Sequence, residues 1–286
     1  MAFLTLPTAK IHYEDNGSGE PVVAVHGLIE NTMYWSETGI AAGLSEKYRF
    51  VSMDMRGHGQ SAATGIPPGY DAETIAGDVE ALADHLGFER FHLLTHSTGG
   101  FAASRWAMEN SHRLAGLMLT DTSSATCPMP GSREEREAFF DKFAASFENQ
   151  TWDEIIAFAK KRPFPFFRGI AEAENNEPMW ETAHRIIRIG NRQEIAKFVR
   201  TFYQDPDLQV ERLPQITCPV LILVGEKDDL FIEPARIMSG AIPDCRHVVM
   251  EGVGHMTAIE APDRLADELL SFLRDHPLEM GSNLNC

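Results

Sequence analysis

Two hydrophobic patterns alternate along most of the chain. Mainly apolar runs of four to seven residues, typical of buried strands, occur at 22–25, 50–53, 91–95, 114–120, 220–224 and 247–250. Apolar residues spaced three or four apart, typical of helices that bury one face, occur at 72–88 and 262–274, and a further helix is predicted at 98–110. Strands that alternate with helices favour a parallel sheet covered on both faces. We therefore predict an α/β fold with a mostly parallel, doubly wound sheet.

The alternation stops between residues 127 and 205. Pro128, Pro130 and Gly131 interrupt the chain, and the residues after them are helical in pattern and rich in Phe and Trp. We predict a helical cap, inserted over the carboxyl ends of the strands, where α/β folds bind ligands. The alternative is a helical subdomain packed for stability. We expect most of these aromatic residues to lie in the core and a minority to line a pocket. The rest of the chain divides into a sheet domain, residues 1–126 and 206–275, and a flexible tail, residues 276–286.

Charge and composition exclude several classes of partner. The 286 residues include 42 Asp and Glu against 25 Lys and Arg, a net charge of -17. Phosphate binding depends on clustered Lys and Arg, so we expect neither a nucleic acid nor a membrane partner. No run approaches the roughly 20 apolar residues that cross a bilayer, and the N-terminus lacks the pattern of a signal peptide. We expect a cytoplasmic protein, with monomer and homodimer both open.

The cysteine and histidine spacings do not predict a metal site. The four cysteines are far apart, with no C-x-x-C pair, which also argues against a disulfide framework. Cys127 is an alternative nucleophile, although its Thr-Cys-Pro setting is typical of a loop. Neither the four cysteines, Cys127, Cys218, Cys245 and Cys286, nor the histidines His58, His92, His96 and His184 have ligand-like spacing. We expect no metal and no cofactor.

A serine comes directly after the strand predicted at 91–95, in the stretch HSTGG at 96–100. A serine on a sharp strand-to-helix turn exposes its hydroxyl at the amino end of a helix, where main-chain N–H groups favour negative charge. The stretch taken alone also fits a simple helix cap. Serine is a weak nucleophile that needs a base, and the base needs a carboxylate to orient it.

Candidates for the base and the acid lie after two later strands. Asp228 lies in a loop after the strand at 220–224, and His255 lies in a glycine-rich loop after 247–250. A parallel sheet gathers residues at the carboxyl ends of its strands along one edge. We therefore predict Ser97 as nucleophile, His255 as general base and Asp228 as the acid. Asp229 and Asp121, which comes after the strand at 114–120, are alternatives for the acid.

The glycine-containing loop after the first strand is a candidate oxyanion hole. There the N–H of Leu28 would point at the developing oxyanion, with the N–H of Thr98 as the second donor. Gly27 is predicted to line the substrate site. Trp35, shortly after this loop, either lines the acyl pocket or packs in the core.

Five short motifs together resemble the α/β-hydrolase superfamily, over nearly the whole chain. They are VHGL at 25–28, DMRGHGQS at 54–61, the turn at Ser97, GEKD at 225–228 and GH at 254–255. The resemblance implies the α/β-hydrolase fold and a serine triad. The second motif is similar to the family's D-x-R-G-x-G-x-S turn, whose glycines and Arg56 would shape a loop near the site.

One position departs from the family pattern G-x-S-x-G, because Thr95 stands in place of the first glycine. Threonine is β-branched, so it suits the strand better than the turn and adds bulk where strand and helix pack. We interpret it as a tolerated variation that shifts Ser97 slightly. A relaxed turn would lower activity.

These residues predict a serine hydrolase that cleaves a small or medium, partly apolar carboxylic ester through an acyl-enzyme. A lactonase is the nearest alternative. Carbon–carbon bond hydrolases share the triad, but the loop after Gly27 lacks the Ser-Gly-Pro-Gly run that many of them carry. A cofactor-free perhydrolase and a non-catalytic ligand receptor on the same fold also stay open. Ser97 argues against haloalkane dehalogenases and epoxide hydrolases, which place an aspartate at the turn.

Overall fold

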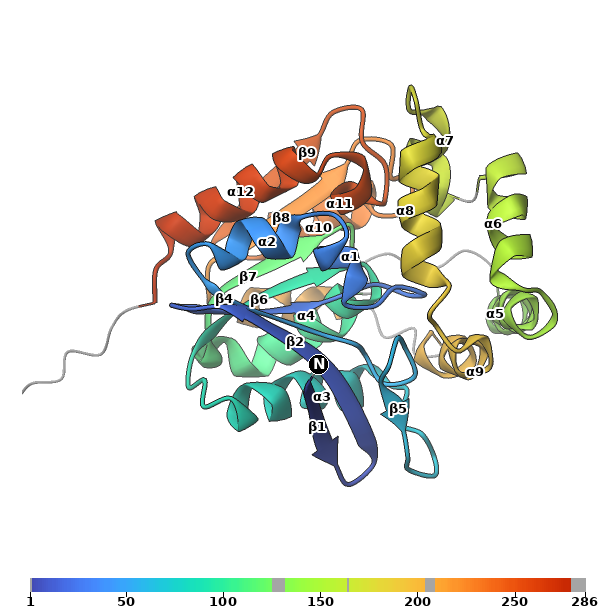
Figure 1. The fold of residues 1–286 in the computed structure, drawn as a ribbon. Coiled ribbons are helices and arrows are strands. Elements are labelled where there is room, and N and C mark those ends of the chain that lie inside the picture. The colour runs from blue at the N-terminus through green and yellow to red at the C-terminus, as the bar shows by residue number, and fades with distance from the viewer. Residues whose placement is uncertain (1, 125–131, 164, 204–208, 279–286) are drawn as a thin grey trace, which may run out of the picture.

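A nine-stranded sheet forms the centre of the molecule (Figure 1). The computed structural model describes residues 2–124, 132–163, 165–203 and 209–278. The strand order is β1-β2-β4-β3-β6-β7-β8-β9, and β5 pairs with β2. The strands are β1 (Ala2–Leu6), β2 (Ala9–Gly17), β3 (Pro21–Val25), β4 (Arg49–Met53), β5 (Ala62–Ala63), β6 (Phe91–His96), β7 (Leu114–Thr120), β8 (Val220–Gly225) and β9 (Cys245–Met250).

Strands β4 to β9 along this order are parallel, whereas β1, β2 and β5 pair antiparallel. The prediction of a mostly parallel α/β sheet is therefore confirmed. The antiparallel strands at the N-terminus were not predicted, because polar residues interrupt the apolar pattern of β2. The pairs Val25 with Thr95, His96 with Thr120 and Gly225 with Met250 bring the carboxyl ends of five parallel strands to one edge of the sheet.

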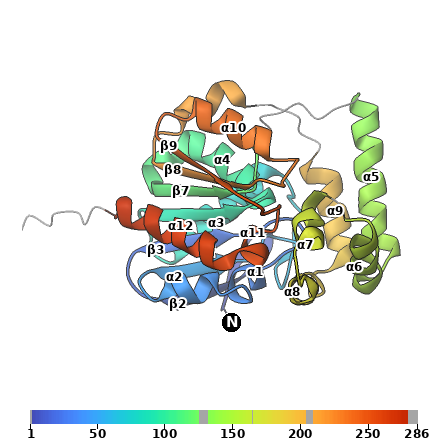
Figure 2. The same ribbon diagram turned by 90° about the horizontal axis from the view of Figure 1, so that it is seen from above.

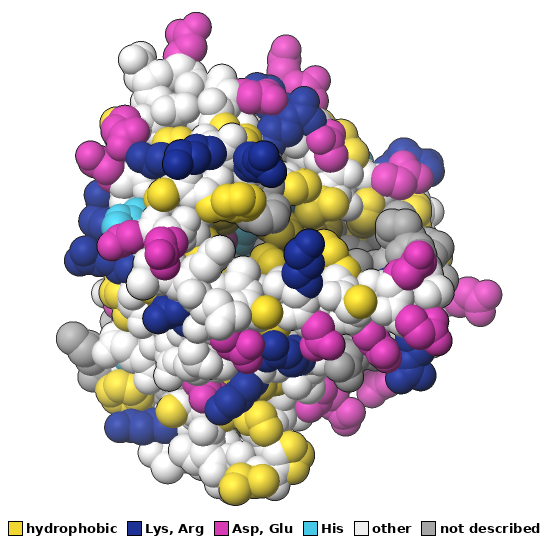
Figure 3. All heavy atoms as spheres, turned by 90° about the vertical axis from the view of Figure 1, so that its right-hand side faces the viewer, with side chains coloured by type: hydrophobic (Ala, Val, Ile, Leu, Met, Phe, Trp, Pro, Cys, Tyr) yellow, Lys and Arg dark blue, Asp and Glu magenta, His cyan; other side chains and the backbone are white. Residues whose placement is uncertain are grey.

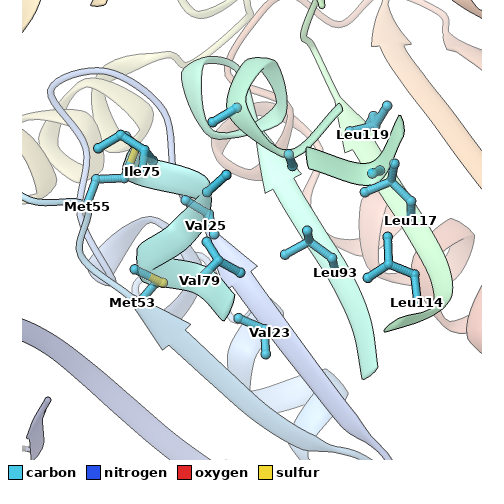
Figure 4. Packing of buried hydrophobic residues seen from close by; sticks show 14 of the residues in the cluster. Val23, Val25, Met53, Met55, Ile75, Val79, Leu93, Leu114, Leu117 and Leu119 are labelled. Atoms are coloured by element: carbon cyan, nitrogen blue, oxygen red, sulfur yellow. The ribbon is translucent and has the colours of Figure 1, made fainter. Parts of the chain in front are cut away.

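Alternate side chains of the strands build two apolar layers, one on each face of the sheet. Val23, Val25 and Leu93 pack with Ile75 and Val79 of α3 on one face (Figure 4). Their neighbours along the strands point to the other face, where α2 and α12 lie (Figure 1). The helices outside residues 132–203 are α1 (Met33–Ser36), α2 (Ile40–Ser45), α3 (Ala72–His85), α4 (Thr98–Asn110), α10 (Ile232–Ala241), α11 (Thr257–Glu260) and α12 (Pro262–Asp275), with short 3-10 turns η1 (Ser111–Arg113) and η3 (Val210–Gln215).

Between β7 and β8 the described residues contain helices and no strand, as predicted. We call α5 to α9, with the 3-10 turn η2, the inserted helices; they group at one end of the sheet (Figures 1 and 2). The boundaries predicted at 126/127 and 205/206 lie outside the described residues, so the division into sheet domain and cap stays a prediction. The inserted helices are α5 (Arg133–Asn149), α6 (Trp152–Lys161), η2 (Pro165–Phe167), α7 (Arg168–Glu172), α8 (Glu177–Ile187) and α9 (Arg192–Phe202).

The first two inserted helices begin with capping boxes, in which the side chains of Ser132 and Thr151 each accept a main-chain N–H three residues later. Most aromatic side chains described in this region pack inward, as expected from the sequence. Phe140, Phe147, Trp152, Phe167 and Trp180 are buried, whereas Phe139 and Phe158 are exposed. In the part of the chain that the structure describes, no helix is both long and apolar enough to cross a bilayer.

Arg56 does shape a loop beside the sheet, and it does so through a buried ion pair. Its guanidinium donates to both carboxylate oxygens of Asp78 on α3, at 2.7 and 2.6 Å. A third donor reaches the carbonyl of Pro68 at 3.0 Å. Both side chains of the pair are at least 96% buried. Desolvated charges are tolerated only when they are paired in this way.

Replacing Asp78 with Asn should lower the free energy of unfolding by about 3–5 kcal/mol, because Arg56 would remain as a buried cation without a charged partner. Urea unfolding measures the change. The matched control is Asp15→Asn, which breaks a partly exposed ion pair whose Arg49 nitrogen and Asp15 oxygen lie 2.7 Å apart. This variant should lower the free energy of unfolding by no more than about 1 kcal/mol. Equal losses in the two variants would contradict the role of burial.

Candidate active site

Ser97 occupies a sharp turn between β6 and α4, with φ 48° and ψ -116°. A positive φ is uncommon for a residue with a side chain, and such strain costs on the order of 1–3 kcal/mol. Hydrogen bonds hold the main chain in this state. The Ser97 N–H donates to the carbonyl of Thr120 at 2.9 Å, and the Thr122 hydroxyl donates to the Ser97 carbonyl at 2.5 Å. The turn is therefore strained and not relaxed, although Thr95 replaces the usual glycine.

Thr95 fits its position because the close approach in this turn occurs on the helix side. Its hydroxyl donates across the sheet to the carbonyl of Met118, at 3.3 Å. A Cβ added to Gly99, in contrast, would lie 2.7 Å from the carbonyl oxygen of His26 and 2.9 Å from Val25. The requirement for glycine is thus at position 99, where the first turn of α4 meets the end of β3.

The structure brings Ser97, His255 and Asp228 together in one hydrogen-bonded row. The Ser97 Oγ lies 3.1 Å from His255 Nε2, and His255 Nδ1 lies 2.7 Å from Asp228 Oδ2. The three residues lie just after β6, β9 and β8, so the parallel sheet gathers them as expected from the sequence. Ser97 is 8% exposed, His255 2% and Asp228 0%, so the row is shielded from solvent.

The two alternative acids lie in different environments. Asp121 is buried and does not contact His255: its carboxylate accepts the Gly225 N–H at 2.9 Å and the Thr257 hydroxyl at 2.7 Å. Burial and the neighbouring charge of Asp228 raise the pKa of Asp121 well above its ordinary value. Asp229 is exposed and pairs with Arg168. Of the three candidates, only Asp228 bonds the imidazole of His255.

The loop after β3 lies directly beside the predicted nucleophile. A Cβ on Gly27 would sit 3.0 Å from the Ser97 Cβ, so the loop main chain passes as close as glycine allows. Two residues after Gly27, Ile29 has a positive φ of 62°. The turn is closed by a hydrogen bond of 3.3 Å from the Glu30 N–H to the Gly27 carbonyl. Leu28 lies within this turn, and Thr98 is the first residue of α4.

Trp35 lies away from any accessible surface. It is fully buried and packs edge to face on Tyr34, with ring centroids 4.9 Å apart. This position agrees with the packing alternative raised by the sequence and gives no support to a role in lining an open acyl pocket.

Aromatic rings surround the row on the side of the inserted helices. Phe231 stacks on the His255 ring at 5.1 Å, and Phe166 of η2 contacts it at 5.0 Å. On the other side of Ser97, the Tyr203 hydroxyl lies 2.6 Å from the Thr98 hydroxyl, and Phe140 of α5 stacks on the Tyr203 ring at 5.1 Å. Burial raises the pKa of Tyr203, so the phenol keeps its proton. Aromatic rings therefore line part of the row's surroundings on this side.

Three polar residues near the row were not identified from the sequence: the buried Glu30 and His96, and the partly buried Glu260. Glu30 bonds the Gly27 N–H, and Glu260 bonds the main chain on both sides of His255. His96 contacts the carbonyl of His255. The one sequence feature that could have indicated them is that each lies in or next to a loop predicted to form the site. Their spacing along the chain does not distinguish them from surface residues. Their roles emerge only where distant loops meet.

The described residues give little support to a cysteine nucleophile or a metal site. Burial raises the pKa of the Cys218 thiol to about 11 and that of Cys245 to about 12, which disfavours the reactive thiolate. Cys127 and Cys286 lie outside the described residues. Among the residues that are described, no three His, Cys, Asp or Glu side chains are grouped so as to hold a metal ion.

Comparison with known proteins gives consistent matches along the chain. Residues 20–262 match the family model described as the alpha/beta hydrolase fold. A non-heme chloroperoxidase of Kitasatospora aureofaciens is 28% identical, over 92% of this chain and 96% of the relative. A pimeloyl-acyl-carrier-protein methyl ester esterase of Aliivibrio salmonicida is 26% identical, over 93% of this chain and 97% of the relative. The solved structure of a thermophilic esterase from Thermogutta terrifontis superposes with a TM-score of 0.79 at 25% identity, and covers 97% of this chain and 100% of that one.

The geometry of the turn makes a prediction about its glycine. Gly99→Ala should destabilise the protein by about 1–3 kcal/mol, because the new methyl group must displace the His26 carbonyl or Val25. The control is Gly77→Ala on the exposed face of α3, where an added Cβ meets nothing within 4 Å; this variant should gain about 0.5–1 kcal/mol from helix propensity. Urea unfolding of both variants is the measurement, and a neutral Gly99→Ala would show that the turn is loosely packed.

Proposed function

The chain belongs to the alpha/beta hydrolase fold family, and from this premise we propose that it is a serine hydrolase that cleaves small or medium carboxylic esters through an acyl-enzyme. The observation that carries the proposal is the row of two hydrogen bonds from Ser97 through His255 to Asp228, of 3.1 and 2.7 Å. A nucleophile bonded to a base, and a base bonded to a buried carboxylate, is the arrangement that activates a serine.

In the proposed mechanism, the Ser97 Oγ attacks the ester carbonyl while its proton passes to His255 Nε2. Asp228 accepts the Nδ1–H bond, which fixes the tautomer and stabilises the imidazolium that forms. As the tetrahedral intermediate collapses, His255 returns the proton to the leaving alcohol and an acyl–Ser97 ester remains. A water molecule, deprotonated by the same imidazole, then attacks this ester, so that the acid leaves and the Ser97 hydroxyl is restored.

The N–H groups of Leu28 and Thr98 are proposed as the oxyanion hole. Two observations support this assignment. The loop that carries Leu28 passes within contact distance of the Ser97 side chain, because a Cβ on Gly27 would lie 3.0 Å from the Ser97 Cβ. Thr98 begins the 13-residue helix α4, so its N–H group shares the positive end of the helix dipole. Donors fixed before the reaction stabilise the developing charge without reorganisation.

The aromatic rings around the row support a neutral, partly apolar substrate, and we propose that the inserted helices act as its cap. Phe166 and Tyr203, which flank the row, come from η2 and the end of α9. Figure 3 views the molecule from this side, where hydrophobic side chains gather near the middle with a Lys or Arg side chain beside them. Two cations on the adjoining segments are paired, Arg168 with Asp229 and Lys227 with Glu172.

One second candidate has a specific observation in its favour. A relative that matches along nearly the whole chain is named a non-heme chloroperoxidase. The same acyl-enzyme would serve a perhydrolase, because hydrogen peroxide can replace water as the attacking molecule and release a peracid with the Ser97 hydroxyl restored. A lactonase differs only in that the leaving alcohol stays tethered to the acyl group.

We expect Ser97→Ala to lower the hydrolysis of short p-nitrophenyl esters by roughly 10⁴-fold, because the nucleophile is lost. Asp228→Asn should lower kcat by roughly 10³- to 10⁴-fold, because an amide does not hold the reactive tautomer. The matched control is Asp229→Asn, the exposed neighbour, which should leave kcat within about 2-fold. Steady-state kinetics on the four proteins test this, and activity retained by Ser97→Ala would overturn the mechanism.

A substrate comparison separates the alternatives. The wild type should hydrolyse an open-chain ester with a higher kcat/KM than a lactone of matching size, and added hydrogen peroxide should not divert most of the acyl product to peracid. The acid and the peracid are both quantified by chromatography. A reversed ester-to-lactone ratio would assign a lactonase, and a peracid-dominated product would assign a perhydrolase.

A further inference from the structure

His96, the residue before Ser97, is completely buried and both of its ring nitrogens face hydrogen-bond acceptors. Nδ1 lies 2.9 Å from a carboxylate oxygen of Glu30, and Nε2 lies 2.9 Å from the main-chain carbonyl oxygen of His255. The ring stacks on Tyr34 with centroids 4.5 Å apart and an interplanar angle of 22°. The position of the imidazole is thus defined on its faces and at both nitrogens.

Two acceptors require two donors, and only the imidazolium provides them. A neutral imidazole carries one N–H and one lone pair, and the lone pair of either tautomer of His96 would face an oxygen lone pair. His26 shows the contrasting case in the same interior. Its Nδ1 faces the Gly27 carbonyl at 2.7 Å, whereas its Nε2 accepts the Met55 N–H at 3.0 Å. His26 therefore suits the neutral form, and His96 the charged one.

The charges around His96 agree with its contacts. Burial by itself lowers the pKa of His96, but the carboxylates of Glu30 and Asp121 and the carbonyl of His255 outweigh it and raise the pKa to about 9. For His26, burial prevails and lowers the pKa. The titratable groups that face the His96 ring are Glu30, Asp121, Tyr34 and His255.

Glu30 extends the contact to the loop of the proposed oxyanion hole. The same carboxylate oxygen that pairs with His96 accepts the Gly27 N–H at 2.6 Å. A Cβ on Gly27 would lie 2.9 Å from His96 Nδ1 and 3.0 Å from this oxygen, so glycine is needed where the three groups meet. A continuous buried chain runs from Gly27 through Glu30 and His96 to the carbonyl of His255.

A second carboxylate binds the main chain of the two residues that flank His255. Glu260, at the end of α11, accepts the Gly254 N–H at 2.6 Å and the Met256 N–H at 3.1 Å, one on each oxygen. The main chain around His255 is therefore bound at three points, namely the N–H groups of Gly254 and Met256 and the carbonyl of His255. The side chain of His255 is bound separately, by Asp228 and Ser97.

We infer that His96 is a buried imidazolium that acts, with Glu30 and Glu260, as a positioning residue for His255. The three charged side chains fix the main chain of the general base, so that its Nε2 stays within reach of the Ser97 hydroxyl. This inference rests on the proposed hydrolase function for its kinetic consequence. The charge state of His96 is independent of that function.

The charge state is tested on the wild-type protein by NMR of ¹⁵N-histidine-labelled samples, with the His96 signals assigned by their loss in His96→Asn. Both ring nitrogens of His96 should carry protons throughout about pH 6 to pH 8, because the raised pKa keeps the ring charged where an ordinary histidine loses its proton. A single-proton tautomer of His96 at pH 7 would overturn the inference, whether or not the protein hydrolyses esters.

The positioning role is tested by kinetics of His96→Asn, Glu30→Gln and Glu260→Gln. Each should lower kcat by roughly 10- to 100-fold, because a small displacement of the base costs about that much, and leave KM within about 3-fold. Reaction of Ser97 with an organophosphate probe should slow by the same factor. A drop confined to KM, or no change in any variant, would contradict the role.

His92 offers a matched control on the same strand. It is also buried, its nearest carboxylate oxygen lies 3.8 Å away on Glu20, and neither of its ring nitrogens makes a hydrogen bond in the described structure. His92→Asn should leave kcat within about 2-fold. An equal loss in His92→Asn would assign the effect to general disturbance of β6 and overturn the positioning role. Absence of ester turnover in the wild type would instead refute the proposed function, and the NMR result would still stand.

Discussion

The conformation of Ser97 is the constraint on which the surrounding structure depends. A residue with a side chain holds a positive φ only where neighbouring groups supply more stabilisation than the strain costs. Here the end of β7 supplies one of them, the carbonyl of Thr120, and the loop after β7 supplies the hydroxyl of Thr122. The end of β3 packs against Gly99 with no room for a methyl group. The turn is thus a product of three adjacent strands, and the serine hydroxyl is presented at the edge where the later loops converge.

Buried and partly buried carboxylates organise those loops. Glu30, Asp54, Asp228 and Glu260 each accept main-chain N–H groups of a loop at the end of a strand. Asp54, for example, binds the N–H groups of Thr32 and Gln60 and the ring of His12. Although burial raises the pKa of Asp54, these partners lower it below its ordinary value. A desolvated anion surrounded by fixed donors gives loops a definite shape, because each unmade bond would leave a buried charge partly unsatisfied.

The inserted helices contact this edge of the sheet in a different way. They contact it through a few polar links, among them the Asn31 amide on the carbonyl of Ile186 at 2.6 Å and the Tyr70 hydroxyl on Glu194 at 2.5 Å. Around the row itself they contribute aromatic rings. In the function that we propose, the edge of the sheet carries the chemistry and the aromatic rings of the inserted helices would select the acyl group.

Much of the fold was predictable from the chain because strand and helix patterns have different periods. The runs at 114–120 and 220–224 and the helix at 98–110 correspond closely to β7, β8 and α4. The positions of Ser97, Asp228 and His255 were predictable for a related reason: each lies just after a buried strand, and parallel strands bring the loops at their carboxyl ends to one edge. The N-terminal β1 and β2 were not, because polar residues interrupt the apolar pattern of β2, which pairs with the adjacent β1 and with the more distant β4.

Contacts between loops were decided only by the tertiary structure. Nothing in the spacing of Glu30, His96 and Glu260 indicates that they converge on His255, because each belongs to a different loop or strand end. The choice between Asp228 and Asp121 likewise depends on a distance that the sequence does not encode locally. Sequence by itself determined which residues lie at the end of which strand, through hydrophobic periodicity. Only the packed sheet decided which buried polar groups meet and hence which of them are charged, since that depends on the partners each finds once water is excluded.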